Sequence, residues 1–146
     1  NGKAGHFNKA VTYINEKIMG LKNKRNRENW SDEAWVDNGY NYFYQWRRKY
    51  IRRNNSGVSP TLTANMGTGG HNVPLVICGE YMDGQKLIRK LTPEECFAIQ
   101  GYSWKFISNM TSQELTNGQL YKQAGNSVPY KLLYKISNKL IDILYG

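Results

Sequence analysis

Apolar positions recur at helical spacing near both ends of the chain. In residues 7–19 the apolar positions Phe7, Ala10, Val11, Ile14 and Ile18 precede Gly20, which is a stop signal. After Pro129 the same spacing joins Leu132, Leu133, Ile136, Leu140, Ile141 and Leu144. We therefore predict a connecting or packing helix over residues 7–19 and an amphipathic helix over residues 129–145. The apolar face of the second helix must pack on this domain or on another one.

The middle of the chain has the pattern of a hairpin. Two apolar runs, residues 73–81 and 86–91, flank Asp83-Gly84, a pair typical of tight hairpin turns. Residues 103–120 lack a clear period, so we expect an irregular polar connection there. Gly125-Asn126-Ser127 has the small residues of a turn.

A short helix with both ends marked follows the hairpin. Thr92 suits the N-cap, Pro93 suits the first helical position, and Glu95 completes a T-x-x-E capping box. Gly101 stands where a left-handed C-terminal residue is expected.

Aromatic and basic side chains are concentrated in the first third of the chain. Residues 22–29 are polar and basic, typical of a solvated loop or of a segment along a phosphate backbone, and both interpretations are open. Residues 30–46 are dense in Trp, Tyr and Phe, which favours a satellite core, with stacking on unpaired bases as the alternative.

Residues 45–55 form the first stretch with nucleic-acid character. A single alternating strand would place Arg48, Tyr50 and Arg52 on one face and Arg47, Lys49, Ile51 and Arg53 on the other. The planar guanidinium of arginine suits both phosphate and the edge of guanine. Many basic strands are only solvated, so this pattern alone leaves both interpretations open.

A glycine-rich loop follows, in residues 57–76. Pro60-Thr61-Leu62-Thr63 predicts a brief extended piece, after which Gly67, Gly69 and Gly70 permit close approach of another backbone. No Gly-Lys-Ser/Thr closes the run, which excludes a P-loop, and no strand-then-helix context supports a dinucleotide site. A loop against a DNA groove and a structural turn remain as alternatives.

Composition predicts one basic domain of 146 residues, with 20 Lys and Arg against 11 Asp and Glu and a net charge of +9. The charge favours a polyanionic partner, although a merely basic protein is also compatible with it.

Cys78 and Cys96 have no metal-ligand spacing and form no disulfide framework, which fits a reduced, intracellular compartment. No apolar run reaches the length of a membrane span. The chain begins at Asn1 without an initiator methionine, which suggests a fragment or a processed chain. The fold class we predict is α+β.

Two motifs in this order resemble the C-terminal signatures of the DNA (cytosine-5) methyltransferases. The penultimate motif is matched by Arg89, Leu91, Thr92, Pro93, Glu95, Gln100 and Gly101, and the final one by Gln123, Gly125, Asn126, Ser127 and Val128. With Pro60-Thr61-Leu62-Thr63 upstream, the resemblance covers roughly the last two-thirds of the chain. It implies a small mixed target-recognition domain at residues 30–110, after a connecting helix and basic loop at 1–29. Residues 111–146 would be a connection and a helix that docks on a cofactor domain.

The resemblance also implies site residues. Thr61-Leu62 matches a pair that contacts DNA at the extruded base, the following loop matches a segment that reads base edges, and residues 52–56 lie where another recognition loop belongs. The DNA-binding residues expected are Arg47, Arg48, Arg52, Arg53, Asn54, Thr61, Leu62, Thr63, Asn65, Gly67, Thr68 and Gly69. Asn126, Ser127 and Val128 would line part of the S-adenosylmethionine pocket, and no metal is expected.

The family's Pro-Cys nucleophile is missing, because Cys78 follows Ile77 and Cys96 follows Glu95. The Gly-rich cofactor loop, the Glu-Asn-Val segment and the Arg-bearing strand are also missing. We therefore expect the recognition part of a bacterial, cytoplasmic restriction-modification enzyme, inactive without an N-terminal catalytic domain or subunit. Its partners would be that domain and double-stranded DNA, with no membrane. A stand-alone DNA-binding module descended from such a domain is the alternative, and an unrelated basic α+β domain is a third interpretation.

Overall fold

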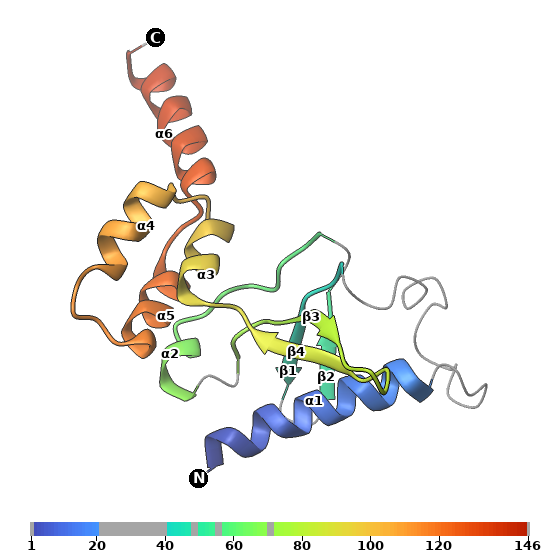
Figure 1. Ribbon diagram of the computed structural model, residues 1–146. Coiled ribbons are helices and arrows are strands. Elements are labelled where there is room, and N and C mark those ends of the chain that lie inside the picture. Colours follow the sequence, from blue (N-terminus) through green and yellow to red (C-terminus); the bar gives the residue numbers. More distant parts are fainter. Residues whose placement is uncertain (1, 21–40, 48–49, 55–56, 70–71, 146) are drawn as a thin grey trace. The chain divides into compact units, whose positions relative to one another are not determined.

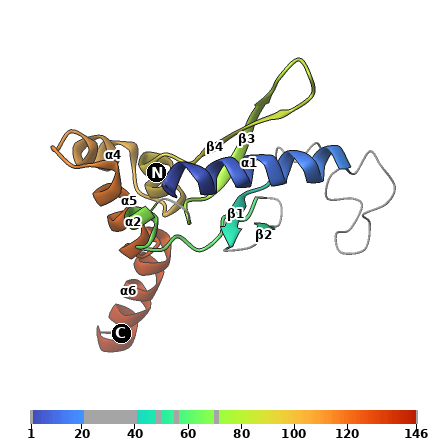
Figure 2. The same cartoon turned by 90° about the horizontal axis from the view of Figure 1, so that it is seen from below.

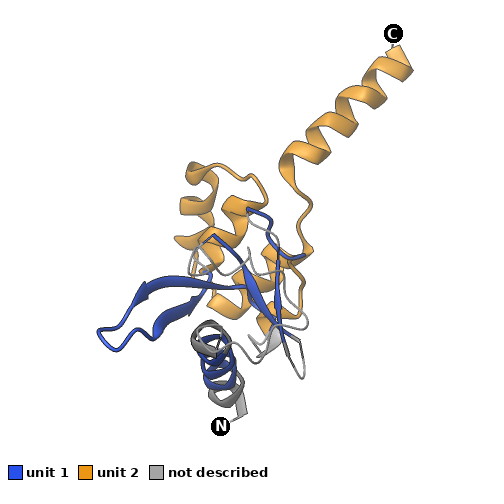
Figure 3. Cartoon of the chain, turned by 90° about the vertical axis from the view of Figure 1, so that its right-hand side faces the viewer, with its two compact units in different colours: residues 1–61, 69–91 blue, residues 62–68, 92–146 orange. Residues whose placement is uncertain are grey.

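The computed structural model describes residues 2–20, 41–47, 50–54, 57–69 and 72–145. Its elements are labelled in Figure 1. The chain forms two compact units, residues 1–61 with 69–91 (unit 1) and residues 62–68 with 92–146 (unit 2), coloured separately in Figure 3. The basic segment 22–29, residues 30–40 of the aromatic segment, and Arg48 lie outside the described residues.

Unit 1 is built on a four-stranded antiparallel sheet of order β2-β1-β3-β4. Its strands are β1 (Tyr44–Arg47), β2 (Tyr50–Arg53), β3 (Leu75–Glu80) and β4 (Lys86–Lys90). The predicted β3–β4 hairpin is confirmed: Gly84 has φ 82°, and Asp83 Oδ1 accepts from Gln85 N at 3.0 Å. Figure 2 shows this hairpin projecting past the other two strands. Positive φ explains why glycine stands at this turn.

The predicted N-terminal helix is also confirmed, as α1 (Gly2–Gly20). Its Ala10 and Ile14 are buried in one core with Tyr44, Ile51, Leu75, Ile77 and Ile88 of the sheet. Figures 1 and 2 both show α1 lying along the sheet. The helix is therefore a packing helix of unit 1.

A buried amide joins α1 to an edge of this sheet. Asn15 Oδ1 accepts from Lys86 N at 2.6 Å, and Asn15 Nδ2 donates to Lys86 O at 3.2 Å. These two hydrogen bonds engage the backbone N–H and C=O of Lys86, as a neighbouring strand would at this edge of the sheet. The Lys86 ammonium, itself buried, pairs with the Glu80 carboxylate across the hairpin.

The single strand predicted within residues 45–55 is wrong. These residues form a hairpin instead, in which Tyr44 pairs with Arg53 and Arg47 pairs with Tyr50. The sequence has no Gly or Asn between Arg47 and Tyr50, so it carries no hairpin signal there. Within β2 the alternation holds, because Ile51 is buried in the core and Arg52 is exposed.

Unit 2 is helical. Its elements are α2 (Met66–Gly69), α3 (Pro93–Ile99), α4 (Trp104–Thr111), α5 (Asn117–Asn126) and α6 (Tyr130–Tyr145). Helix α3 packs against α4 and α5. The side chains of unit 2 that are buried include Leu62, Met66, Cys96, Phe97, Ile107, Leu120 and Ala124. The chain as a whole is therefore α+β, as predicted.

The predicted capped helix is confirmed in detail. Thr92 is the N-cap, its hydroxyl accepts from Glu95 N at 3.3 Å, and the Glu95 carboxylate accepts from Thr92 N at 2.8 Å. Gly101 has φ 86°, as its place after the helix requires.

The irregular connection predicted over residues 103–120 is wrong. Ser103 caps α4, and Thr116 caps α5 in a second capping box completed by Gln119. The T-x-x-Q spacing was the signal that could have found α5. The predicted turn at Gly125-Asn126-Ser127 is shorter than expected, because Gly125 and Asn126 belong to α5 and Ser127 is its C-cap.

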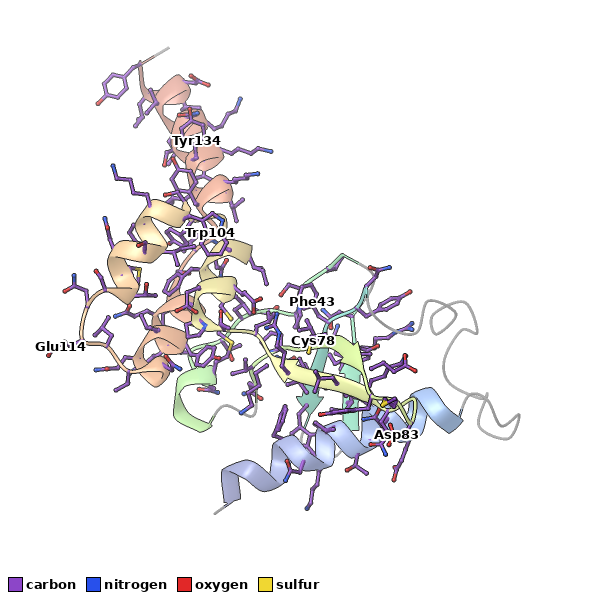
Figure 4. All side chains as sticks on the ribbon, viewed as in Figure 1. Phe43, Cys78, Asp83, Trp104, Glu114 and Tyr134 are labelled. Carbon is purple, nitrogen blue, oxygen red and sulfur yellow. The ribbon has the colours of Figure 1, made fainter. Side chains whose placement is uncertain are left out.

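Helix α6 confirms the predicted amphipathic helix, and its apolar face is not buried against the residues that the structure describes. The structure describes the whole helix, and none of its side chains is buried. It extends from the other helices of unit 2 (Figure 3), and the ring of Tyr134, labelled in Figure 4, stacks on that of Tyr130 within the same helix. Its apolar stripe consists of Leu132, Leu133, Ile136, Leu140, Ile141 and Leu144, each roughly half exposed or more.

Candidate DNA- and cofactor-binding residues

The expected basic residues of unit 1 lie on the β1–β2 hairpin. Arg52 is exposed on the opposite face of β2 from the core residue Ile51. The Arg53 guanidinium lies 4.3 Å from the centroid of the Tyr42 ring, a cation–π geometry that orients it. Asn54 follows, and its backbone N–H donates to Phe43 O at 2.9 Å. Arg47 ends β1 in register with Tyr50. Strand β2 thus presents the guanidinium groups of Arg52 and Arg53.

Sequence reasoning missed Gln45, which lies opposite Arg52 in the β1–β2 register. Its side chain is only 1% exposed, and its Nε2 donates to Asn72 O at 3.0 Å. This hydrogen bond ties β1 to the end of the glycine-rich loop. A glutamine inside a basic, aromatic run carries no signal of burial, so only the structure identifies it.

The Thr-Leu segment, residues 61–69, lies in unit 2 from Leu62 to Thr68 and carries both buried and exposed side chains. Leu62 and Met66 are buried, whereas Thr61 and Asn65 are exposed. Met66 N donates to Thr63 O at 3.0 Å, and this turn leads into α2. Thr68 and Gly69 lie in α2, a helical turn that the sequence did not predict. From Thr63 onwards the segment is therefore a folded turn, with the buried side chains of Leu62 and Met66 on either side of it.

The expected cofactor residues follow directly from α5. Asn126 is exposed, Ser127 Oγ donates to Ala124 O at 2.8 Å, and Val128 is about half exposed. Gln100 holds this turn from α3. Its Nε2 donates to Ala124 O at 3.3 Å, and its backbone O accepts from Tyr130 N at 2.8 Å.

These contacts bring the two motifs together in unit 2. Gln100, from the penultimate motif, bridges the residues on both sides of the Ser127 turn in the final motif. The exposed amide of Asn126 can donate and accept hydrogen bonds, as recognition of a polar ligand requires. The basic hairpin belongs to unit 1, so the expected DNA-binding residues divide between the units.

The two cysteines lie in different settings. Cys96 is fully buried in α3, and burial, with Glu95 and Glu94 nearby, raises the pKa of its thiol to about 12. A thiol with that pKa is protonated at neutral pH and a poor nucleophile. Cys78 is exposed on β3 (Figure 4), where its Sγ donates to Leu87 O at 3.4 Å.

Two further findings concern metal and membrane. Among the residues described by the structure, no three His, Cys, Asp or Glu side chains gather where they could hold a metal ion. Of the helices within the described ranges, none has the length and apolar character needed to cross a membrane.

Known proteins with similar sequences are named as methyltransferases. Over 97 residues the chain is 56% identical to "Type II methyltransferase M.Bsp6I" from Bacillus sp. (strain RFL6), a match covering 66% of this chain and 28% of that protein. It is 37% identical over 95 residues to "Orphan methyltransferase M.Rho11sI" of Bacillus phage rho11s, covering 65% of this chain and 18% of that protein. The chain thus matches less than a third of the length of these relatives. No solved structure matches it.

The match to a protein family covers nearly the whole chain. Residues 3–142 match the family described as "C-5 cytosine-specific DNA methylase", including α1, the sheet and the helices of unit 2. The chain therefore belongs to the C-5 cytosine-specific DNA methylase family.

Proposed function

We propose that this chain is the DNA-recognition and C-terminal part of a cytosine-5 methyltransferase of a bacterial restriction-modification system. The complete enzyme would transfer a methyl group from S-adenosylmethionine to C5 of cytosine in duplex DNA. The observation that carries the proposal is the meeting of motifs in unit 2. Residues 62–68, the part of the penultimate motif from Thr92 to Gly101, and the final motif are far apart in sequence, yet they lie in one compact unit.

The chemistry of the DNA contacts follows from the exposed groups. Arg52 and Arg53 supply guanidinium groups that suit phosphate or the edge of guanine, while Thr61 and Asn65 supply short donors and acceptors. Rigid backbone around Leu62 and Met66 would hold the segment against a groove. The target cytosine must leave the duplex before its C5 is reachable, so these contacts act on DNA whose base is flipped.

S-adenosylmethionine supplies the methyl group when it is bound. Asn126, Ser127 and Val128 fit one edge of its pocket, because an exposed amide and a half-exposed valine stand side by side on a short turn. The remaining walls would come from the N-terminal part. That part would also supply the nucleophile, because Cys96 is buried and protonated and Cys78 lies on a strand of the sheet.

Helix α6 supports the same proposal. Its apolar stripe is about half exposed along its whole length, which is unusual for a helix that functions alone. We expect the stripe to dock on the N-terminal catalytic part, as a domain or as a separate subunit. The chain alone would then bind DNA weakly or aggregate, and it would not methylate DNA.

A salt titration of duplex binding tests the DNA-recognition role. Arg52→Ala with Arg53→Ala should weaken binding and lower the slope of log affinity against log salt by about 1.8, the value for two lost phosphate contacts. Lys131→Ala with Lys135→Ala on the exposed polar face of α6 is the matched control, because it removes the same charge. Equal loss in both pairs would point to net charge alone, and unchanged affinity in the arginine pair would refute the assignment. Tight, specific binding by the chain alone would favour a stand-alone DNA-binding module.

A further inference from the structure

Glycines allow the Thr-Leu segment to lie directly on α5. A Cβ added at Gly125 would come within 2.5 Å of Ala64 N and closer still to the carbonyl group of Thr63. One added at Gly67 would overlap the carbonyl oxygen of Gly118. Real Cβ atoms essentially never approach other atoms this closely. The segment and the helix therefore touch backbone to backbone at two places.

These contacts cannot be relieved by a change of rotamer. The atoms that a Cβ at Gly125 would strike belong to the main chain of Thr63 and Ala64. Leu62 and Met66, on either side of that peptide, are themselves buried. A side chain at position 125 would therefore have to displace the whole segment or the end of α5. Displacing packed backbone is costly because interiors are close-packed.

The same glycine stands next to the turn that follows α5. Asn126 ends the helix, and Ser127 Oγ returns to Ala124 O. Gln100 holds Ala124 O from the side of α3. The end of α5 is thus fixed on one side by α3 and meets the Thr-Leu segment through Gly125.

We propose that Gly125 is a positioning residue that fixes the Thr-Leu segment relative to the Asn126–Ser127 turn. This inference rests on the function proposed above, in which Gly125 would set the distance between the groups that contact DNA and the groups that contact the cofactor. Gly67 makes the equivalent contact at the other end of the segment. Gly125 itself touches neither DNA nor cofactor in this account.

The kinetic test uses the enzyme completed by its N-terminal part, with Gly125→Ala. A displaced segment should raise KM for DNA by about tenfold, the factor that a typical overpacking cost produces, and should lower discrimination against sites with one altered base. A residue with a merely structural role would lower the amount of active enzyme, and so kcat, while leaving KM and discrimination unchanged. That second pattern would overturn the proposal.

Hydrogen exchange of this chain separates the proposal from the proposed function. The amides of Met66 and Gly67 donate to Thr63 O and Ala64 O, so they report on the segment directly. Gly125→Ala and Gly67→Ala should speed their exchange by at least about tenfold, whereas β3–β4 amides should not change. If these variants exchange faster but the completed enzyme is inactive even without a substitution, the positioning role of Gly125 stands and the proposed methyltransferase function is refuted. Unchanged exchange would overturn the positioning whatever the activity.

Graded variants cover the case in which Gly125→Ala fails to fold. Gly118→Ala brings its Cβ to 3.1 Å from Gly67 O, a tight contact that a small shift relieves. Its effect on Met66 and Gly67 exchange should be smaller but measurable. Gly79→Ala is the matched control, because its Cβ would make ordinary contacts at 3.6 Å with Leu87. Equal effects of Gly118→Ala and Gly79→Ala would overturn the proposal.

Discussion

Shortening the apolar stripe of α6 should weaken the association of this chain with the proposed N-terminal catalytic part. The change is Ile136→Ala with Leu140→Ala. These side chains are 48% and 52% exposed, so about half of each surface is available for burial in an interface. Full burial of such a side chain is worth about 1.5–3 kcal/mol, so the pair would contribute about 1–3 kcal/mol after allowing for the methyl groups that alanine keeps. Dissociation constants should rise roughly 5- to 150-fold.

Titration calorimetry of the chain against the separately produced N-terminal part would measure this change. Alanine is a better helix former than isoleucine, so helix content by circular dichroism should not fall. Lys135→Ala with Asn138→Ala, on the exposed polar face of the same helix, should leave the affinity unchanged. If both double variants bind as tightly as the original chain, α6 does not dock through its apolar stripe, and the argument from its exposure is refuted.

Two further predictions concern unit 1 and the thiols. Asn15→Ala would leave the buried N–H and C=O of Lys86 without their partner, so unfolding free energy should fall by about 2–3 kcal/mol and the Lys86 amide should exchange faster. The exposed helix residue Asn8→Ala is the control, and an unchanged Lys86 amide would contradict the pairing. At pH 8 a disulfide reagent should label Cys78 readily and Cys96 only after denaturation, because burial raises the pKa of Cys96 to about 12. Because the folded chain holds the Cys96 proton more tightly than the unfolded chain, the stability that this thiol contributes is full below its ordinary pKa of 9.0 and is lost as pH rises towards 12. Rapid labelling of both thiols in the folded chain would contradict the prediction.

Local rules in the sequence predicted the elements whose ends are marked by particular residues. Thr92, Glu95 and Gly101 define α3, and Asp83-Gly84 defines the β3–β4 hairpin, because caps and turns depend on residues next to one another. Helix α5 carried the same kind of signal in Thr116 and Gln119, but its weak apolar period concealed it.

Long-range contacts were not predictable in this way. Asn15 and Lys86 are 71 residues apart, and nothing in either local pattern marks the hydrogen bonds between them. The contact of Gly125 with the Thr63–Ala64 peptide depends on the absence of a side chain, which a sequence displays equally at every glycine. The family motifs predicted candidate site residues, whereas only the fold shows that Gln100 of one motif bonds to Ala124 and Tyr130 on both sides of the Ser127 turn.

The most direct test of the account is a methyl-transfer assay with labelled S-adenosylmethionine and mixed-sequence duplex DNA. It compares this chain alone, the N-terminal part alone, and the two together. The account predicts label in DNA only from the mixture, because it assigns the nucleophile and most of the cofactor pocket to the N-terminal part. Transfer by this chain alone would contradict the account, because the nucleophile would then have to lie within this chain. No transfer by a mixture that associates would contradict the proposed methyltransferase role.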